Sequence, residues 1–240
     1  MQTGRAVAAC LDGGTLQGVR EALKGAGFAL EGAAASAGEA LRMVRTIQPE
    51  LLLADAVLPG GDAVWLAERL ACTPMNVYPA LLVMLPEGLN VPGIERLPVF
   101  GAATVGKPPC AAGIERALRQ VPPDVLPPGK ARRLEALLDA LGVPAHPGRQ
   151  VLVHAVGLGF RDRRRLDNLR DGIYPAAGAA CGLSAAQAER AMRHVIDSAW
   201  RTGEIEQQQR IFGDTIDARR GRPTCGEMIA QLADILRWEG

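Results

Sequence analysis

The sequence predicts a doubly wound α/β domain with a five-stranded parallel sheet, followed by an all-α domain that contains a helix-turn-helix. Three observations predict this arrangement. Short apolar runs alternate with helical patterns through residues 1–120, a proline-rich stretch covers 121–130, and the apolar residues of 131–240 recur with a helical period. Apolar runs separated by helices are typical of a parallel sheet that is covered on both faces.

Strands and helices alternate in the first of these domains. The carboxyl ends of parallel strands meet at one edge of a doubly wound sheet, so functional groups are expected there. The expected strands are AVAAC (6–10), FALEGAA (28–34), LLLAD (51–55), ALLVML (80–85) and ATVG (103–106). The expected helices cover about 15–25, 37–47, 62–72 and 110–120.

The segment VPPDVLPPG, which begins at Val121, is rich in proline and is expected to be a semi-rigid, extended linker. The remainder of the chain has helical patterns and no alternating strand pattern. The expected helices cover about 131–142, 148–159, 163–171, 174–181, 184–202, 204–212 and 224–238.

The composition is that of a globular protein with little net charge. The chain has 240 residues, with 27 Lys and Arg against 26 Asp and Glu. Its five cysteines are widely spaced without a C-x-x-C pair, which is typical of reduced thiols. The sequence has no signal-peptide pattern and no apolar run long enough for a bilayer, so we expect a cytoplasmic protein without a membrane partner.

Polar side chains follow three of the expected strands. Asp12 comes after the first strand, Asp55 ends the third, and Lys107 follows the fifth. Carboxylates are hard oxygen ligands for Mg²⁺, and a lysine can neutralise phosphoryl oxygens. An aspartate can also act as a nucleophile and form an aspartyl-phosphate. The sequence therefore predicts a site for Mg²⁺ and a phosphoryl group at this edge of the sheet.

The stretch PELLLADAVLPGGDA and the pair Lys107-Pro108 resemble the two-component receiver domain. The resemblance covers nearly the whole first domain. It implies that Asp55 is the phosphoacceptor and that Lys107 contacts the phosphoryl group. It also implies a Mg²⁺ site made of Asp12, Asp55 and the carbonyl of Val57. The phosphodonor would be a histidine kinase or a phosphotransferase.

Three positions depart from the receiver pattern. Receivers usually carry two acidic residues after the first strand, and here the first of these positions is Leu11. Leu85 replaces the hydroxyl residue that usually ends strand four, and Val105 replaces the aromatic residue of strand five. A missing carboxylate should weaken Mg²⁺ binding, and a missing hydroxyl removes part of the switch. A receiver-shaped dimerisation module that is not phosphorylated is therefore the alternative.

The stretch SAAQAERAMRHVIDSAW predicts an amphipathic helix that begins with a capping box of Ser184 and Gln187. The preceding YPAAGAACGLS predicts a short helix that ends at Gly182, so the pair forms a helix-turn-helix. The second helix of that motif meets base edges in the major groove. Its polar face has suitable side chains, although a solvated face is the alternative. These are Gln187, Glu189, Arg190, Arg193 and His194.

Four motifs resemble the DNA-binding domain of the stage-zero sporulation protein A family over about 134–237: LGVPAH, ERAMRHVIDSAW, IFGDTI and GRPTCGEMIAQLAD. The resemblance implies a six-helix domain whose recognition helix contacts a promoter box. Gln187 lies where the family usually has arginine, and the two side chains favour different bases. The residues that the resemblance places on contacting positions are Glu189, Arg190, Arg193 and His194.

A second basic cluster lies in the stretch DARRGRPT. Its members are Arg219, Arg220 and Arg222, and the resembling family is basic here too. Arginines in such a loop can contact phosphates, which would hold a DNA duplex in register. A solvated loop is the alternative interpretation.

We therefore interpret the chain as a DNA-binding transcriptional regulator of the two-component response-regulator type, and not as an enzyme. It would bind double-stranded promoter DNA as a homodimer. Two alternatives stay open. One is a phosphorylation-independent pseudo-receiver regulator, which Leu11 and Leu85 favour. The other is an antagonist that dimerises with a true family member, against which the arginines of the recognition helix argue.

Overall fold

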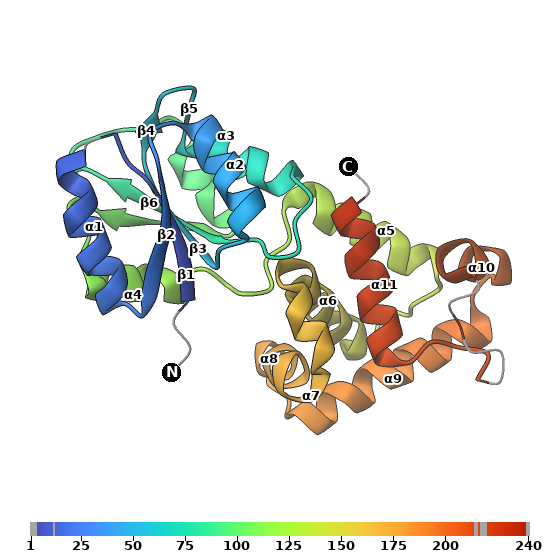
Figure 1. The fold of residues 1–240 in the computed structure, drawn as a ribbon. Coiled ribbons are helices and arrows are strands. Elements are labelled where there is room, and N and C mark those ends of the chain that lie inside the picture. The colour runs from blue at the N-terminus through green and yellow to red at the C-terminus, as the bar shows by residue number, and fades with distance from the viewer. Residues whose placement is uncertain (1–3, 12, 214–215, 217–219, 239–240) are drawn as a thin grey trace. The chain divides into compact units, whose positions relative to one another are not determined.

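The computed structural model describes residues 4–11, 13–213, 216 and 220–238. The chain divides into two compact units, residues 1–127 and 128–240, which we call the N-terminal and C-terminal units. Figure 1 shows a sheet with helices on both faces in the first unit and a group of helices in the second. The division lies within the stretch 121–130 that is expected to be a linker.

The N-terminal unit is built on a parallel sheet with the strand order β2-β1-β3-β6-β7. This order is one of the two common doubly wound arrangements, so the predicted fold class is confirmed. The strands are β1 (Gly4–Ala9), β2 (Phe28–Ala34), β3 (Leu51–Asp55), β6 (Ala80–Leu85) and β7 (Ala102–Gly106). The helices are α1 (Gly13–Gly25), α2 (Ala37–Ile47), α3 (Ala63–Cys72) and α4 (Ala111–Arg119).

Two helices cover each face of this sheet (Figure 1). α1 and α4 pack over one face, and α2 and α3 over the other, because β1, β3 and β6 are apolar on both sides. The residues of the core under α1 and α4 are buried. They include Val19, Leu23, Leu51, Leu53, Leu82, Met84 and Ile114.

The structure adds two elements that the sequence patterns do not predict. A short ladder pairs β4 (Val57–Leu58) with β5 (Gly61–Asp62) around a turn in which Gly60 has a φ of 84°. Pro59 before that glycine fixes the other turn position, as in a type II turn. A 3-10 helix, η1 (Ile94–Phe100), lies between β6 and β7 and contains Pro98, whose missing N–H disfavours a regular α-helix there.

The regular elements in the described residues of the C-terminal unit are all helices, as predicted. Its elements are α5 (Pro128–Ala140), α6 (Pro147–Arg161), the 3-10 helix η2 (Arg163–Asp167), α7 (Leu169–Gly172), α8 (Tyr174–Ala180), α9 (Ala185–Thr202), α10 (Ile205–Phe212) and α11 (Cys225–Trp238). α5 begins inside the expected linker, because Pro128 is well suited to a first helical turn.

The prediction of one continuous helix over 163–171 is wrong. It is broken at Asn168, whose side chain accepts a hydrogen bond from the backbone of Asp171 and starts α7. Side chains of this type compete with helix formation by bonding nearby backbone groups. No helix of the described ranges is long and apolar enough to cross a membrane.

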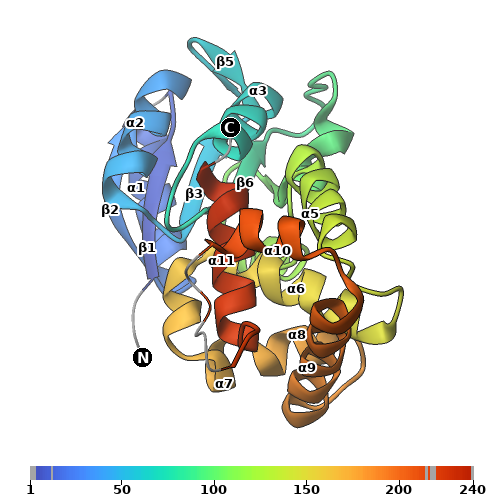
Figure 2. The same cartoon turned by 90° about the vertical axis from the view of Figure 1, so that its right-hand side faces the viewer.

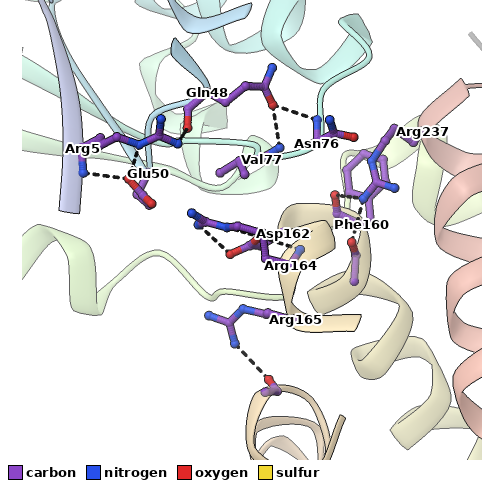
Figure 3. Close-up of polar contacts among 12 residues, drawn as sticks. Arg5, Gln48, Glu50, Asn76, Val77, Phe160, Asp162, Arg164, Arg165 and Arg237 are labelled. Atoms are coloured by element: carbon purple, nitrogen blue, oxygen red, sulfur yellow. Dashed lines mark hydrogen bonds and ion pairs between the residues drawn. The ribbon is translucent and has the colours of Figure 1, made fainter. Parts of the chain in front are cut away.

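α6 is the central helix of the C-terminal unit. It packs against α8, α9 and α11, and Figure 1 and Figure 2 show it beside α11. Arg237 of α11 is 1% exposed and donates to the carbonyls of Gly159 and Phe160 at 2.7 and 2.9 Å (Figure 3). A cation at the C-terminal end of a helix satisfies its last carbonyls and its dipole. These contacts tie the two helices together.

At the other end of α6, glycine lets two helices approach closely. A Cβ added to Gly148 would collide with the backbone carbonyl of Ala191 in α9. His146 begins α6 as its N-cap, and its Nδ1 accepts from Gly148 N–H at 3.1 Å. The start of α6 therefore fixes the position of α9.

We expect Gly148→Ala to destabilise the C-terminal unit by about 1–3 kcal/mol, because backbone must move to admit the methyl group. The measurement is the free energy of unfolding in urea. Gly129→Ala is the matched control, since an added Cβ there meets nothing within 4 Å. It should be neutral or slightly stabilising. Equal effects of the two substitutions would contradict the close approach.

We also expect the two units to fold separately. Residues 120–127 contain no helix or strand, and Gln120, Pro122 and Pro123 are exposed, so this segment should be the first cut in limited proteolysis. Brief digestion with an unspecific protease should give two resistant fragments, with new ends at about 120–128, identified by mass spectrometry. A digest without stable fragments, together with a single cooperative melt, would count against two independent units.

Candidate phosphoacceptor site and nucleic-acid interface

Asp55 and Lys107 meet at the carboxyl edge of the sheet. Asp55 ends β3 and is 4% exposed, and Lys107 directly follows β7. The Nζ of Lys107 lies 2.6 Å from Oδ1 of Asp55, and the backbone N–H of Leu11 donates to Oδ2 at 3.0 Å. The structure thus brings two of the predicted site residues together, and each oxygen of the Asp55 carboxylate has a partner.

The rim of this site is apolar. Leu11 is 56% exposed and Val57 is 50% exposed. Leu85 ends β6, and its carbonyl accepts the backbone N–H of Lys107 at 3.2 Å. Its side chain offers no hydroxyl. A phosphoryl group on Asp55 would therefore find Lys107 and the backbone N–H of Leu11 nearby, and no hydroxyl at the end of β6.

The described residues do not by themselves make a metal site. No group of three His, Cys, Asp or Glu that could hold a metal ion occurs among them. Val57 pairs with Asp62 in the β4–β5 ladder. The other predicted ligand, Asp12, lies outside the described residues, so Asp55 is the one predicted carboxylate whose surroundings are seen.

Cys10 is a further group at this edge that the sequence patterns do not single out. Burial raises the pKa of its thiol to about 11, and the Asp55 carboxylate adds to the rise while Lys107 opposes it. The thiol therefore stays protonated and unreactive at neutral pH. Val105, at the expected aromatic position, is buried in the core under α4.

The helix-turn-helix of the C-terminal unit is formed by α8 and α9. The N–H of Leu183 donates to the carbonyl of Gly178, and the N–H of Gly182 donates to the carbonyl of Ala179. These two bonds form the Schellman pattern that ends a helix. Gly182 has a φ of 69°, the left-handed conformation that this pattern requires. The short turn follows from these residues.

α9 begins with the predicted capping box. Ser184 accepts from the backbone of Gln187, and the side chain of Gln187 reaches back to the backbone of Ser184. One face of the helix is buried, as its apolar stripe predicts. The buried residues are Ala188, Met192, Val195, Ile196 and Ala199.

The predicted recognition residues lie on the other side of α9. Gln187, Arg190, Arg193 and His194 are exposed, and Glu189 is half-buried. Arg193 forms an ion pair with Glu189 one turn earlier. The ring of His194 lies against that of His146, with the centroids 5.0 Å apart. Arg190 forms no ion pair within the described part of the chain.

The second basic cluster lies beside the same helix. Arg222 pairs with Asp197 of α9, and Arg220 pairs with Glu227 of α11 at 2.8 Å. Arg219 lies outside the described residues. A cavity of about 430 Å³ separates the two basic groups, and Arg193, Arg220 and Arg222 all line it. The structure therefore places Arg193 of the predicted recognition helix around one cavity with Arg220 and Arg222.

Three of its supporting residues were missed by the sequence analysis. Thr224 and Glu227 form a reciprocal capping box at the start of α11, a T-x-x-E signal that is visible in the sequence. Burial tends to raise the pKa of Glu227, but hydrogen bonds from Thr224 and Arg220 outweigh it and lower the pKa. Asp197 has no sequence signal, because its partner is 25 residues away along the chain.

A further basic segment, RDRRR at 161–165, makes contacts within the C-terminal unit. Arg163 pairs with Asp234, Arg164 with Asp162, and Arg165 donates to the carbonyl of Gly172. The last two contacts are drawn in Figure 3. These arginines hold the segment between α6 and α8.

Two comparisons with known proteins each match only part of the chain. About half of the chain resembles solved receiver structures from bacteria, with low sequence identity. One is a CheY-like receiver domain from Methylobacillus flagellatus, with 20% identity, 49% of this chain and 98% of that chain covered, and a TM-score of 0.41. Another is the chemotaxis response regulator CheY4 of Vibrio cholerae, with 18% identity, 49% and 98% covered, and a TM-score of 0.41.

The C-terminal unit matches a family model. The model is described as sporulation initiation factor Spo0A C terminal, and it matches residues 134–236. The match spans the described elements from α5 to α11, including the helix-turn-helix. Residues 134–236 are therefore a Spo0A C-terminal domain, joined to a doubly wound N-terminal unit.

Proposed function

We propose that this chain is a DNA-binding transcriptional regulator of the two-component response-regulator type, whose C-terminal unit binds promoter DNA through α9. One observation carries the proposal. A helix-turn-helix presents Arg190, Arg193 and His194 on its exposed face, and Arg220 and Arg222 flank that face. The match to the Spo0A C-terminal domain supports it.

The chemistry of this surface suits duplex DNA. The N-terminal half of a recognition helix enters the major groove, where the fork of an arginine matches the O6 and N7 atoms of guanine. Arg220 and Arg222 would contact phosphates beside the groove and set the register of the helix. Arg219 would extend this contact.

Some arginines of this surface are paired with carboxylates, which DNA would have to replace as partners. Glu189 and Asp197 each hold an arginine in the free protein. The pair of Arg193 with Glu189 is partly exposed, and surface ion pairs are worth about 0–1 kcal/mol, so a base edge can replace Glu189 at small cost. Glu189 could then accept from a cytosine amino group, which fits its place on the recognition helix.

For the N-terminal unit we propose a weak phosphorylation response. Asp55 would be the phosphoacceptor, with a histidine kinase or a phosphotransferase as donor and Lys107 as partner of the phosphoryl group. Mg²⁺ would bind weakly to Asp12, Asp55 and the carbonyl of Val57, because Leu11 replaces a usual ligand. The unit would favour a homodimer on DNA, and such a regulator would act in the cytoplasm without turnover chemistry of its own.

A phosphorylation-independent regulator is the second candidate. The observation that favours it is that both oxygens of the Asp55 carboxylate already accept hydrogen bonds, one from Lys107 and one from the backbone N–H of Leu11. An antagonist that binds DNA poorly is less consistent with the exposed arginines of α9.

We predict that Arg190→Ala and Arg193→Ala each weaken binding to the preferred duplex by about 1–3 kcal/mol and random duplex by less. The measurement is fluorescence anisotropy at fixed salt. Arg201→Ala is the matched control, since it removes the same charge about 16 Å along α9 from Arg190. The assignment of the recognition helix is wrong if the first two variants bind both duplexes as the wild type does.

We also predict that acetyl phosphate with Mg²⁺ changes the DNA affinity of the wild type by no more than a few-fold. Asp55→Ala should bind the same duplex within a few-fold of the wild type. Asp55→Asn is a second control, because it keeps the shape of the side chain without a nucleophilic carboxylate. A gain of roughly tenfold, about 1.4 kcal/mol of coupling, in the wild type alone would establish a working switch.

A further inference from the structure

Gln187 is part of the recognition surface and of the cap of α9. Its Oε1 accepts one hydrogen bond from the backbone N–H of Ser184 and a second from the Ser184 hydroxyl, each at 2.9 Å. An amide oxygen has two lone pairs, and both are used here. A backbone N–H can only donate, so the atom that faces it is the oxygen and not the nitrogen of the amide.

The other half of the amide is available to a ligand. The side chain of Gln187 is exposed, and its Nε2 makes no hydrogen bond within the described part of the chain. That nitrogen carries two N–H donors. Gln187 therefore offers donors and no acceptor on the face of α9 that carries Arg190 and Arg193.

We propose that Gln187 is a specificity-determining residue that selects guanine over adenine in the bound duplex. The inference rests on the proposed function. Glutamine recognises adenine with both ends of its amide, since the oxygen accepts from N6 and the nitrogen donates to N7. In this chain the cap holds the oxygen, so the pairing with adenine is incomplete.

The amide nitrogen of Gln187, which the cap does not use, suits guanine. It presents two acceptors in the major groove, O6 and N7, whereas adenine presents N7 beside an amino donor. A group that only donates is attracted by the first pattern and partly repelled by the second. Gln187 thus acts like an arginine, which also has donors and no acceptor, although its own residue type suggests adenine.

Reading adenine would disrupt the start of α9. Oε1 would have to give up two hydrogen bonds, and the N–H of Ser184 would lose its partner in the cap. The first N–H groups of a helix have no partner within the helix, so the loss is not made good locally. The same contact that begins the recognition helix therefore sets its base preference.

The test is a selection of binding sites from a random duplex library with the full chain. The wild type is compared with Gln187→Arg, Gln187→Glu and Arg190→Ala. We expect guanine at the position that Gln187 controls, retained in Gln187→Arg. Gln187→Glu keeps an oxygen acceptor for the cap but has no donor, so it should lose the guanine preference and bind the wild-type site about tenfold more weakly. Circular dichroism should report unchanged helix content.

Three outcomes would overturn this assignment in different ways. If the wild type selects adenine at the position whose base preference changes in Gln187→Glu, Oε1 must leave the cap when DNA binds. Identical selected sites for the wild type and Gln187→Glu, with a changed site for Arg190→Ala, would mean that Gln187 contacts no base. Failure of the wild type to enrich any sequence would reject DNA recognition itself, and the proposed function with it.

Discussion

The close contact between α6 and α9 is the constraint on which the C-terminal site depends. Gly148 lets the start of α6 reach the backbone of α9, and the apolar stripe of α9 is buried. A helix with one face fixed in this way has its opposite face fixed as well, because side-chain directions repeat with the helical period. The exposed arginines of α9 are therefore held at a defined surface by packing on the other side of the helix.

Periodicity explains which parts of the fold could be predicted. The five strands are apolar runs and α9 has a long apolar stripe, so both are visible in the sequence. The β4–β5 ladder is too short to give a pattern, and η1 contains Pro98 within a weakly patterned stretch. The break at Asn168 depends on one side-chain hydrogen bond, which competes locally with a helical pattern that continues past it.

The candidate sites could be predicted as residue types but not as partnerships. Strand ends converge in a doubly wound sheet, so the approach of Asp55 and Lys107 follows from topology. The pairs of Arg222 with Asp197 and of Arg220 with Glu227 depend on how residues 220–222 lie against α9 and α11, which no local pattern encodes. The hydrogen bond from Leu11 to Asp55 involves a backbone N–H, so the residue type at that position gives no hint of it.

If Asp55 is the phosphoacceptor, as proposed, its contacts in this structure would limit how strongly the N-terminal unit responds to phosphorylation. A modification shifts a two-state equilibrium only through interactions that differ between the states. Lys107 already holds the Asp55 carboxylate and would also hold its phosphoryl group, so this contact exists before and after modification. Leu85 can add no hydrogen bond. The backbone N–H of Leu11 also contacts the carboxylate already, and one neutral donor supplies little of the energy that a switch requires.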